Sequence, residues 1–205
     1  MSPWFKDGVL TDEAVQAHER VRAERLIRPA WACMPIAGGM ACRGTRLPWL
    51  NVCVGMGLTQ EITPADVQRL VSWYDEHGVD GRVELADRVD PRALTVLGQA
   101  GFRIASLISV IALTLDDGQL EVPPACSTGI QVRRVDPADA QTTQDLAEVV
   151  TRGFASQAEP PREHLEANIA AARSRGGHAF AAFADGQVIG GGFLDCLGGV
   201  APLWG

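Results

Sequence analysis

The spacing of apolar residues alternates between a helical and a strand-like period along the chain. Apolar positions three or four residues apart predict amphipathic helices in five stretches. These stretches are 12–28, 64–77, 91–100, 142–154 and a segment carrying Leu165, Ile169 and Ala172. Before the second stretch, Thr63 precedes Pro64 and Asp66, which is the residue order of an N-terminal capping box.

Short apolar runs bounded by turn residues predict the strands. A short meander is expected within 30–57, single strands at 82–86 and 130–136, and the longest strand signal at 102–115, with a bulge or turn near Ser109. Residues 178–205 read as three consecutive strands, because Asp185-Gly186 and Gly198-Gly199 are tight-turn pairs. The last of these strands leaves an unpaired edge.

Turn-forming residues and a Pro-Pro pair in 116–128 predict a linker between two domains, 1–115 and 129–205. Strands and helices occur on both sides of this linker, so the fold class expected is α+β with mixed sheets. An alternative is one composite domain, in which elements from 58 to 115 complete the sheet of 129–205.

Composition and charge narrow the classes of partner. The 205 residues are 46% hydrophobic and carry a net charge of −7, which argues against a nucleic-acid or anionic-membrane partner. No export signal precedes the first helix, and the apolar run 104–115 is too short to span a membrane. Five cysteines without a Cys-x-x-Cys pair predict no metal site, and a reducing cytoplasm is expected.

Residues 129–205 resemble the opening half of a GNAT (acyl-CoA N-acyltransferase) domain. The shared features are the strand IQVRRVD, two helical stretches and the three-strand meander. The family's pyrophosphate-binding loop, Gln/Arg-x-x-Gly-x-Gly/Ala, would begin just past Gly205. The resemblance therefore implies that 129–205 is the N-terminal half of a second GNAT domain.

Residues 1–115 resemble a GNAT domain from its second strand onwards. ALTVLGQAGF (93–102) contains the family's Gly-Phe pair at Gly101-Phe102, but the position of its general-acid Tyr falls on Leu97 and that of its Asn on Pro91. LTQEIT occupies the pyrophosphate-loop position without a glycine pair. The resemblance implies a degenerate, non-catalytic GNAT-like domain.

By this resemblance the chain uses acetyl-CoA, without a metal, to acetylate a small-molecule or peptide amine. The cofactor contacts map to Leu203, Trp204 and Gly205, although these can also be chain-terminal residues with no ligand. We expect weak or absent activity from this chain. The alternative function is a non-catalytic binding module or a homodimer joined through the strand edge 200–205.

No catalytic residue follows from the sequence. The acids and histidines near the two helices of the second domain are more typical of solvated side chains than of a catalytic base or a metal ligand. They are Glu148, Glu159, Glu163, His164 and His178, the last expected at a sheet edge. Tyr74 is expected in the core or at an interface, and the strand cysteines Cys33, Cys42 and Cys53 are expected to be small buried residues. Glycines 190–192 are expected to allow close backbone approach or a bulge rather than to bind phosphate.

Overall fold

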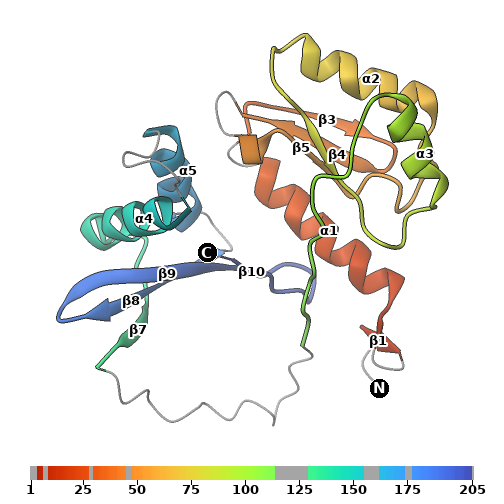
Figure 1. The fold of residues 1–205 in the computed structure, drawn as a ribbon. Coiled ribbons are helices and arrows are strands. Elements are labelled where there is room, and N and C mark those ends of the chain that lie inside the picture. The colour runs from red at the N-terminus through yellow and green to blue at the C-terminus, as the bar shows by residue number, and fades with distance from the viewer. Residues whose placement is uncertain are drawn as a thin grey trace. The chain divides into compact units, whose positions relative to one another are not determined.

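The chain was analysed as a computed structural model, which describes residues 4–6, 9–27, 30–44, 48–113, 129–154, 162–173 and 177–204 (Figure 1). The chain divides into two compact units, residues 1–115 and residues 116–205, called unit 1 and unit 2 below. The predicted linker 116–128 lies outside the described residues.

Unit 1 contains a four-stranded sheet, a small hairpin and three α-helices. Its strands are β1 (Phe5–Lys6), β2 (Val9–Leu10), β3 (Ala32–Ile36), β4 (Gly39–Arg43), β5 (Val52–Val54) and β6 (Arg82–Glu84). Its helices are α1 (Asp12–Ile27), the 3₁₀ turn η1 (Pro48–Leu50), α2 (Pro64–Asp75) and α3 (Arg92–Gln99). The order in the main sheet is β3-β4-β5-β6, antiparallel except for the parallel pair β5 and β6.

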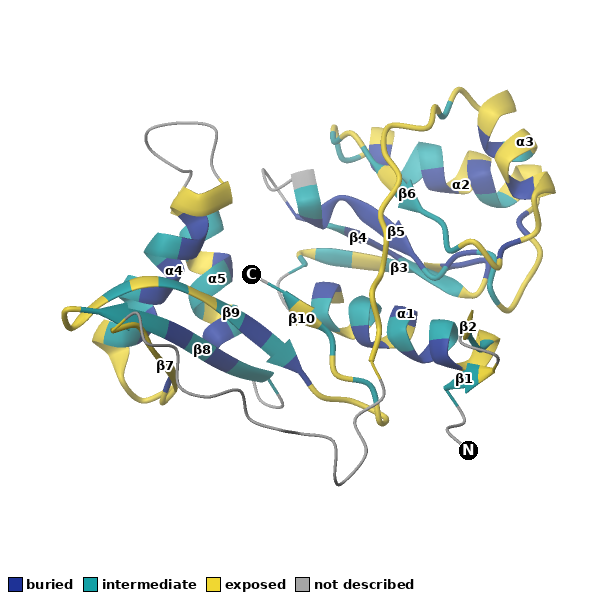
Figure 2. Cartoon of the chain, turned by 60° about the horizontal axis from the view of Figure 1, so that its bottom comes forward, coloured by how far each residue is buried: buried dark blue, intermediate teal, exposed yellow. Residues whose placement is uncertain are grey.

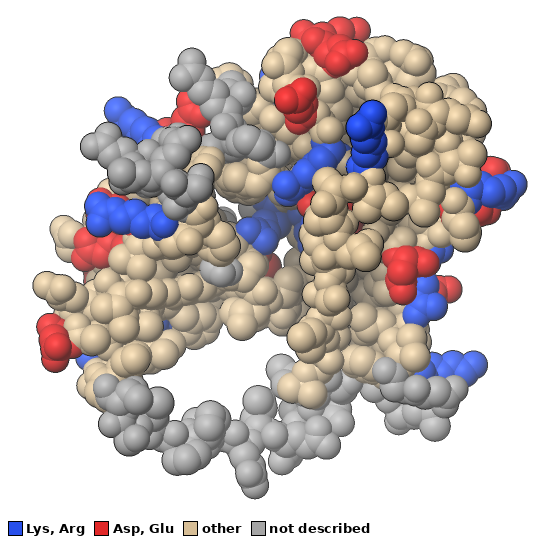
Figure 3. All heavy atoms as spheres, in the orientation of Figure 1, with Lys and Arg blue, Asp and Glu red and all other residues tan. Residues whose placement is uncertain are grey.

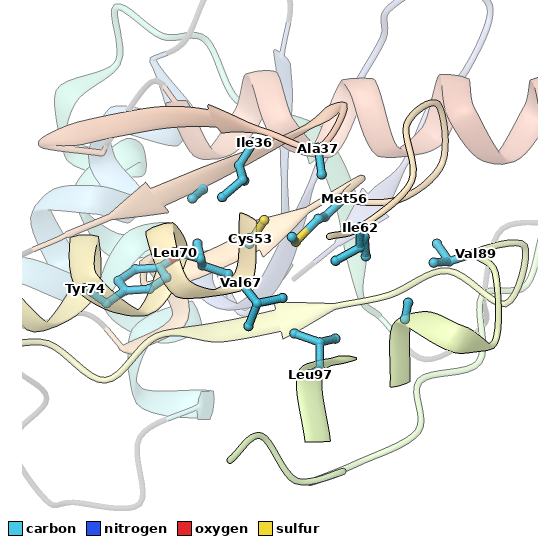
Figure 4. Packing of buried hydrophobic residues seen from close by; sticks show 12 residues of the cluster. Ile36, Ala37, Cys53, Met56, Ile62, Val67, Leu70, Tyr74, Val89 and Leu97 are labelled. Carbon is cyan, nitrogen blue, oxygen red and sulfur yellow. The ribbon is translucent and has the colours of Figure 1, made fainter. Parts of the chain in front are cut away.

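The sheet of unit 1 lies between two helical layers, with α1 on one face and α2 and α3 on the other (Figure 1). Val67 and Leu70 of α2 are completely buried and pack with Met56 and Leu97 (Figure 4). The Tyr74 hydroxyl donates a hydrogen bond to the Cys42 carbonyl over 3.1 Å, which satisfies the polar group of a buried ring. Tyr74 is therefore a core residue, as predicted.

The predicted capping box begins α2. Asp66 N–H donates to Thr63 Oγ1 over 3.2 Å, and Thr63 N–H donates to Asp66 Oδ2 over 3.1 Å. Pro64 occupies the first turn, where its missing N–H costs nothing. The N-terminus of this helix is thus satisfied by its own side chains.

In the described part of unit 2, a strand is followed by two helices and then by three further strands. The elements are β7 (Gln131–Arg134), α4 (Ala140–Phe154), α5 (Arg162–Ala172), β8 (Gly177–Ala184), β9 (Gln187–Asp195) and β10 (Leu203–Trp204). The sheet order β10-β9-β8-β7 is antiparallel throughout. Asp185 (φ 48°) and Gly186 (φ 77°) make the predicted tight turn between β8 and β9.

Both helices of unit 2 pack on one face of its sheet. Leu146 is fully buried against Ala181, and Phe193 completes this core. On the other face no element of unit 2 covers the sheet among the described residues, and Val132 and Leu203 are exposed there. Figure 2 shows the contrast between the buried helix side and the strands' exposed positions.

The strand predicted at 102–115 is wrong for the described part, 102–113. Phe102 packs against the core of unit 1, but residues 103–113 form no strand or helix and are exposed. A strand signal measures the side chains, whereas a strand also needs a partner for its backbone. Within the helical ranges predicted at 91–100 and 142–154, the apolar residues Leu94 and Phe154 are exposed. His178 lies on β8, an interior strand, not at an edge.

The central glycine of the 190–192 run has a packing role. A Cβ atom at Gly191 would lie 2.2 Å from Leu146 Cδ1 and 2.4 Å from the Phe180 carbonyl oxygen. A Cβ atom at Gly190 would meet nothing within 4 Å. Helix α4 therefore approaches the sheet over Gly191, as the sequence predicted for this run.

We predict that Gly191→Ala destabilises unit 2 by about 2–3 kcal/mol, because the added methyl group overpacks the helix–sheet contact. The matched control Gly190→Ala should change the free energy of unfolding by less than about 0.5 kcal/mol. Urea unfolding followed by circular dichroism measures both. Equal effects of the two substitutions would contradict the close-approach role of Gly191.

Candidate functional site

The predicted cofactor residues lie on the edge strand of unit 2. Leu203 and Trp204 form β10, which pairs with β9 on one side only. The Trp204 ring stacks on Phe193 with centroids 4.3 Å apart, and its Nε1–H donates to Asp195 Oδ2 over 2.9 Å. The third predicted residue, Gly205, lies outside the described residues. Trp204 is thus held rigidly while Leu203 remains exposed.

An open hollow of about 510 Å³ lies beside this edge strand. Its lining is apolar and contains two glycines, and both described cofactor residues belong to it. The lining residues are Val132, Phe180, Ala182, Gly191, Gly192, Leu203 and Trp204. An apolar hollow beside a strand can accept a flexible chain that carries short alkyl segments.

The candidate bases of unit 2 do not form a cluster. Glu148 accepts a hydrogen bond from Gln144 and lies 3.7 Å from Arg152, as a solvated surface acid does. Glu163 Oε2, His164 Nε2 and His178 Nδ1 are buried atoms with no hydrogen-bond partner among the described residues. Glu159 lies outside those residues. No catalytic base is identified among them.

A second polar site, which the sequence did not reveal, lies where β5 and β6 of unit 1 end. Glu19 on α1 is buried, and its Oε2 accepts a hydrogen bond of 3.1 Å from the backbone N–H of Gly55, immediately after β5. Its Oε1 accepts from Arg22 over 3.0 Å, and Arg22 also pairs with Glu84 at the end of β6. This Glu19 cluster fastens α1 to the carboxyl ends of two parallel strands.

The charges of the Glu19 cluster are mutually stabilised. Burial raises the pKa of Glu19, but the hydrogen bond from His18 and the positive charge of Arg22 outweigh burial, so its pKa is lowered overall. Burial lowers the pKa of Arg22, whereas the carboxylates of Glu19 and Glu84 raise it by more. Glu19 is therefore an ionised structural partner rather than a protonated acid at neutral pH.

The loop between β5 and α2 also uses its own backbone donors. Gly57 N–H donates to the Ala37 carbonyl over 2.9 Å, in addition to the Gly55 bond to Glu19. At the start of α2, Pro64 has no N–H and Asp66 fills the capping box. Glu61 adds a further negative charge to this loop. The loop offers an incoming anion few donors and two carboxylates.

The remaining candidates in unit 1 are inert. Burial raises the pKa of the Tyr74 hydroxyl and of the Cys42 thiol, and it raises the pKa of Cys53 to about 12. Cys42 and Cys53 are buried as predicted, but Cys33 on β3 is exposed. Leu97, at the position of the family's general-acid Tyr, is buried in the core. The raised pKa values of Tyr74, Cys42 and Cys53 make these groups unsuited to proton transfer near neutral pH.

Charge and metal chemistry give no further site in the described residues. Figure 3 shows basic and acidic side chains interspersed on the visible face of unit 1. No group of three or more His, Cys, Asp or Glu side chains in the described ranges could hold a metal ion. Among the helices of those ranges, none has the length and apolar character that crossing a membrane requires.

We predict that Glu19→Gln destabilises unit 1 by about 2–3 kcal/mol at pH 7, because Arg22 loses a buried partner. The lowered pKa means that ionised Glu19 stabilises the fold above its usual pKa of 4.5, and that this contribution is lost as pH falls below that value. The gap between wild type and variant should therefore shrink on acidification.

Urea unfolding at pH 7 and at about pH 3.5 tests this prediction. Glu24→Gln, on an exposed position of the same helix, is the control and should have almost no effect at either pH. A gap between wild type and Glu19→Gln that stays constant with pH would show that the charge of Glu19 is not what matters.

Comparison with known proteins gives the fold. The sequence matches no family model and no curated protein sequence. Among solved structures, it is similar to a GCN5-related N-acetyltransferase from Kribbella flavida, with a TM-score of 0.52 and 14% sequence identity. The match covers 92% of this chain and 70% of that chain. The chain therefore has a GNAT-like α/β fold.

Proposed function

We propose that this chain is a GNAT-type N-acetyltransferase polypeptide, in which unit 2 contacts acetyl-CoA and unit 1 is a non-catalytic GNAT-like domain. The observation that carries this proposal is the position of β10. A strand, two helices and a meander lead to it, it lies at the sheet edge, and Leu203 and Trp204 line the apolar hollow beside it. The similarity to a GCN5-related N-acetyltransferase supports the proposal at the level of fold.

The chemistry proposed is transfer of an acetyl group from a thioester to an amine. The neutral amine attacks the thioester carbonyl and forms a C–N bond. The C–S bond then breaks, the thiolate leaves, and the amine proton passes to water. A backbone N–H directed at the carbonyl can stabilise the oxyanion, and backbone groups can bind the amides of the pantetheine arm. The hollow beside β10 is suited to the acetyl and pantetheine chain.

Unit 1 is proposed to be non-catalytic because its equivalent donors are occupied. The N–H that follows its strand β5 binds the carboxylate of Glu19, which would repel a developing oxyanion. Glu61 in the loop before α2 and Asp66 in the first turn of α2 lie where a diphosphate would need free backbone N–H groups. Leu97 has no proton to give to a thiolate.

We expect slow turnover or none from this chain, because the contacts proposed involve the pantetheine arm and the acetyl group alone. The acceptor proposed is a small-molecule or peptide amine. The free thiols of Cys33, Cys42, Cys53 and Cys196 agree with a reducing cytoplasm, which is the compartment that we propose.

A non-catalytic binding or dimerisation module is the second candidate. It is favoured by a specific observation, namely that the strand-end and loop donors of unit 1 are used by the chain itself. The edge of β10 would then bind another chain in place of a cofactor.

Calorimetric titration with acetyl-CoA and with S-acetylpantetheine tests the proposal. We predict weak, saturable binding of both, with dissociation constants of about 0.1–1 mM and within about threefold of each other, because the contacts proposed involve only the groups that the two compounds share. Leu203→Ala should weaken binding about tenfold. The control Ile189→Ala, on an exposed residue of β9 outside the hollow, should not.

Two results would contradict the proposal. Absence of binding by either compound would exclude the edge of β10 as a cofactor site and favour the binding module. Acetyl-CoA binding that is a hundred times tighter than that of S-acetylpantetheine would reveal a diphosphate site outside the contacts proposed here.

A further inference from the structure

The chain that follows α3 is a strand-forming sequence without a partner. From Arg103 to Leu113 it forms no helix or strand, and Figure 2 shows it exposed along its length. Leu107 is 93% exposed and Ile111 is 96% exposed. The large aliphatic side chains exposed in this segment are Ile104, Leu107, Ile108, Val110, Ile111 and Leu113. Such a continuous apolar surface marks an interaction site.

Both faces of the segment would be apolar if it were extended. Ile104, Ile108 and Val110 fall on one face. Leu107, Ile111 and Leu113 fall on the other. Strands that are apolar on both faces are typical of the buried interior of a sheet, not of a solvated edge. The segment also contains no proline and a single charge, Arg103, so nothing in it opposes pairing.

Unit 1 also holds an acceptor for a strand. Its sheet ends at β3 on one side and at β6 on the other. Pro35 lies within β3 and has no N–H to offer, which blunts that edge. Strand β6 pairs only with β5 and contains no proline, so its outer edge is open in the described part of unit 1.

We propose that residues 103–113 of one copy pair with the β6 edge of a second copy, and that the second copy returns the same contact. A free strand and a free edge in the same unit allow two copies to satisfy each other reciprocally, which closes a two-fold dimer. A partner other than this chain would leave one donor and one acceptor unmatched. The exchange uses residues of unit 1 alone, so it does not depend on acetyl-CoA binding.

Phe102 sets the start of the exchanged strand. It packs against the core of its own unit, whereas the next residues are exposed. The donor therefore remains anchored at one end and extends from a fixed point. Pairing adds backbone hydrogen bonds to the burial of side chains, so both the apolar surface and the N–H groups of the segment should matter.

Sedimentation equilibrium of the full chain tests the dimer. Wild type should be a dimer at micromolar concentration, and the double variant Leu107→Asp, Ile111→Asp should raise the dimer dissociation constant at least a hundredfold. Because both side chains are exposed within one copy, the double variant should keep the circular dichroism spectrum and melting temperature of wild type that has been diluted to monomer. Leu94→Asp, at an exposed apolar position on α3, is the matched control and should leave the dimer intact.

Ser109→Pro separates strand pairing from general hydrophobic attraction. It removes one backbone N–H from the segment and keeps every large apolar side chain, so it should also dissociate the dimer. Amide hydrogen exchange of the wild-type dimer should show protection at 103–113 and at 82–85, and dilution to monomer should remove it.

Four results would overturn the proposal. The first is a wild type that is still a monomer at roughly 0.1 mM. The second and third are a dimer that survives the Asp substitutions and a dimer that survives Ser109→Pro. The fourth is a monomer in which 103–113 is already protected, which would place the strand in its own copy. A dimer lost in Leu203→Ala but not in the segment variants would assign the interface to β10 instead.

Discussion

The hydrogen bond between the Glu19 carboxylate and the Gly55 N–H fixes the arrangement of unit 1. It fastens α1 to the end of β5, and Arg22 extends the connection to Glu84 on β6. A backbone donor that holds a buried carboxylate is not available to a substrate. In the function that we propose, the interaction that completes the fold of unit 1 also occupies a backbone donor that could otherwise stabilise an oxyanion.

Helices cover the sheets of the two units differently. In unit 1, helices cover both faces, and the core of β-strand and helix side chains is closed. In unit 2, α4 and α5 cover one face, and the opposite face holds the apolar hollow beside β10. We propose chemistry at the hollow beside β10 and association at the segment after Phe102.

Local signals in the sequence predicted much of this fold. Thr63 and Asp66 form their capping box, Asp185-Gly186 makes its turn, and Gly191 permits close approach, because each of these depends on neighbouring residues or on a missing side chain. The Glu19 cluster was not predictable, since its partners are distant in sequence. The strand at 102–115 failed in its described part because its apolar pattern specifies burial but not the partner that provides it.

The central claim is that the chain itself occupies the donors of unit 1 and leaves the edge of β10 to the cofactor. Amide hydrogen exchange of the full chain, with and without saturating acetyl-CoA, tests this claim most directly. The account predicts slower exchange at residues 193–204 and no change at 55–66. Protection at 55–66, with none at 193–204, would contradict it. The cofactor would then lie on the loop whose backbone N–H groups bind Glu19 and Asp66.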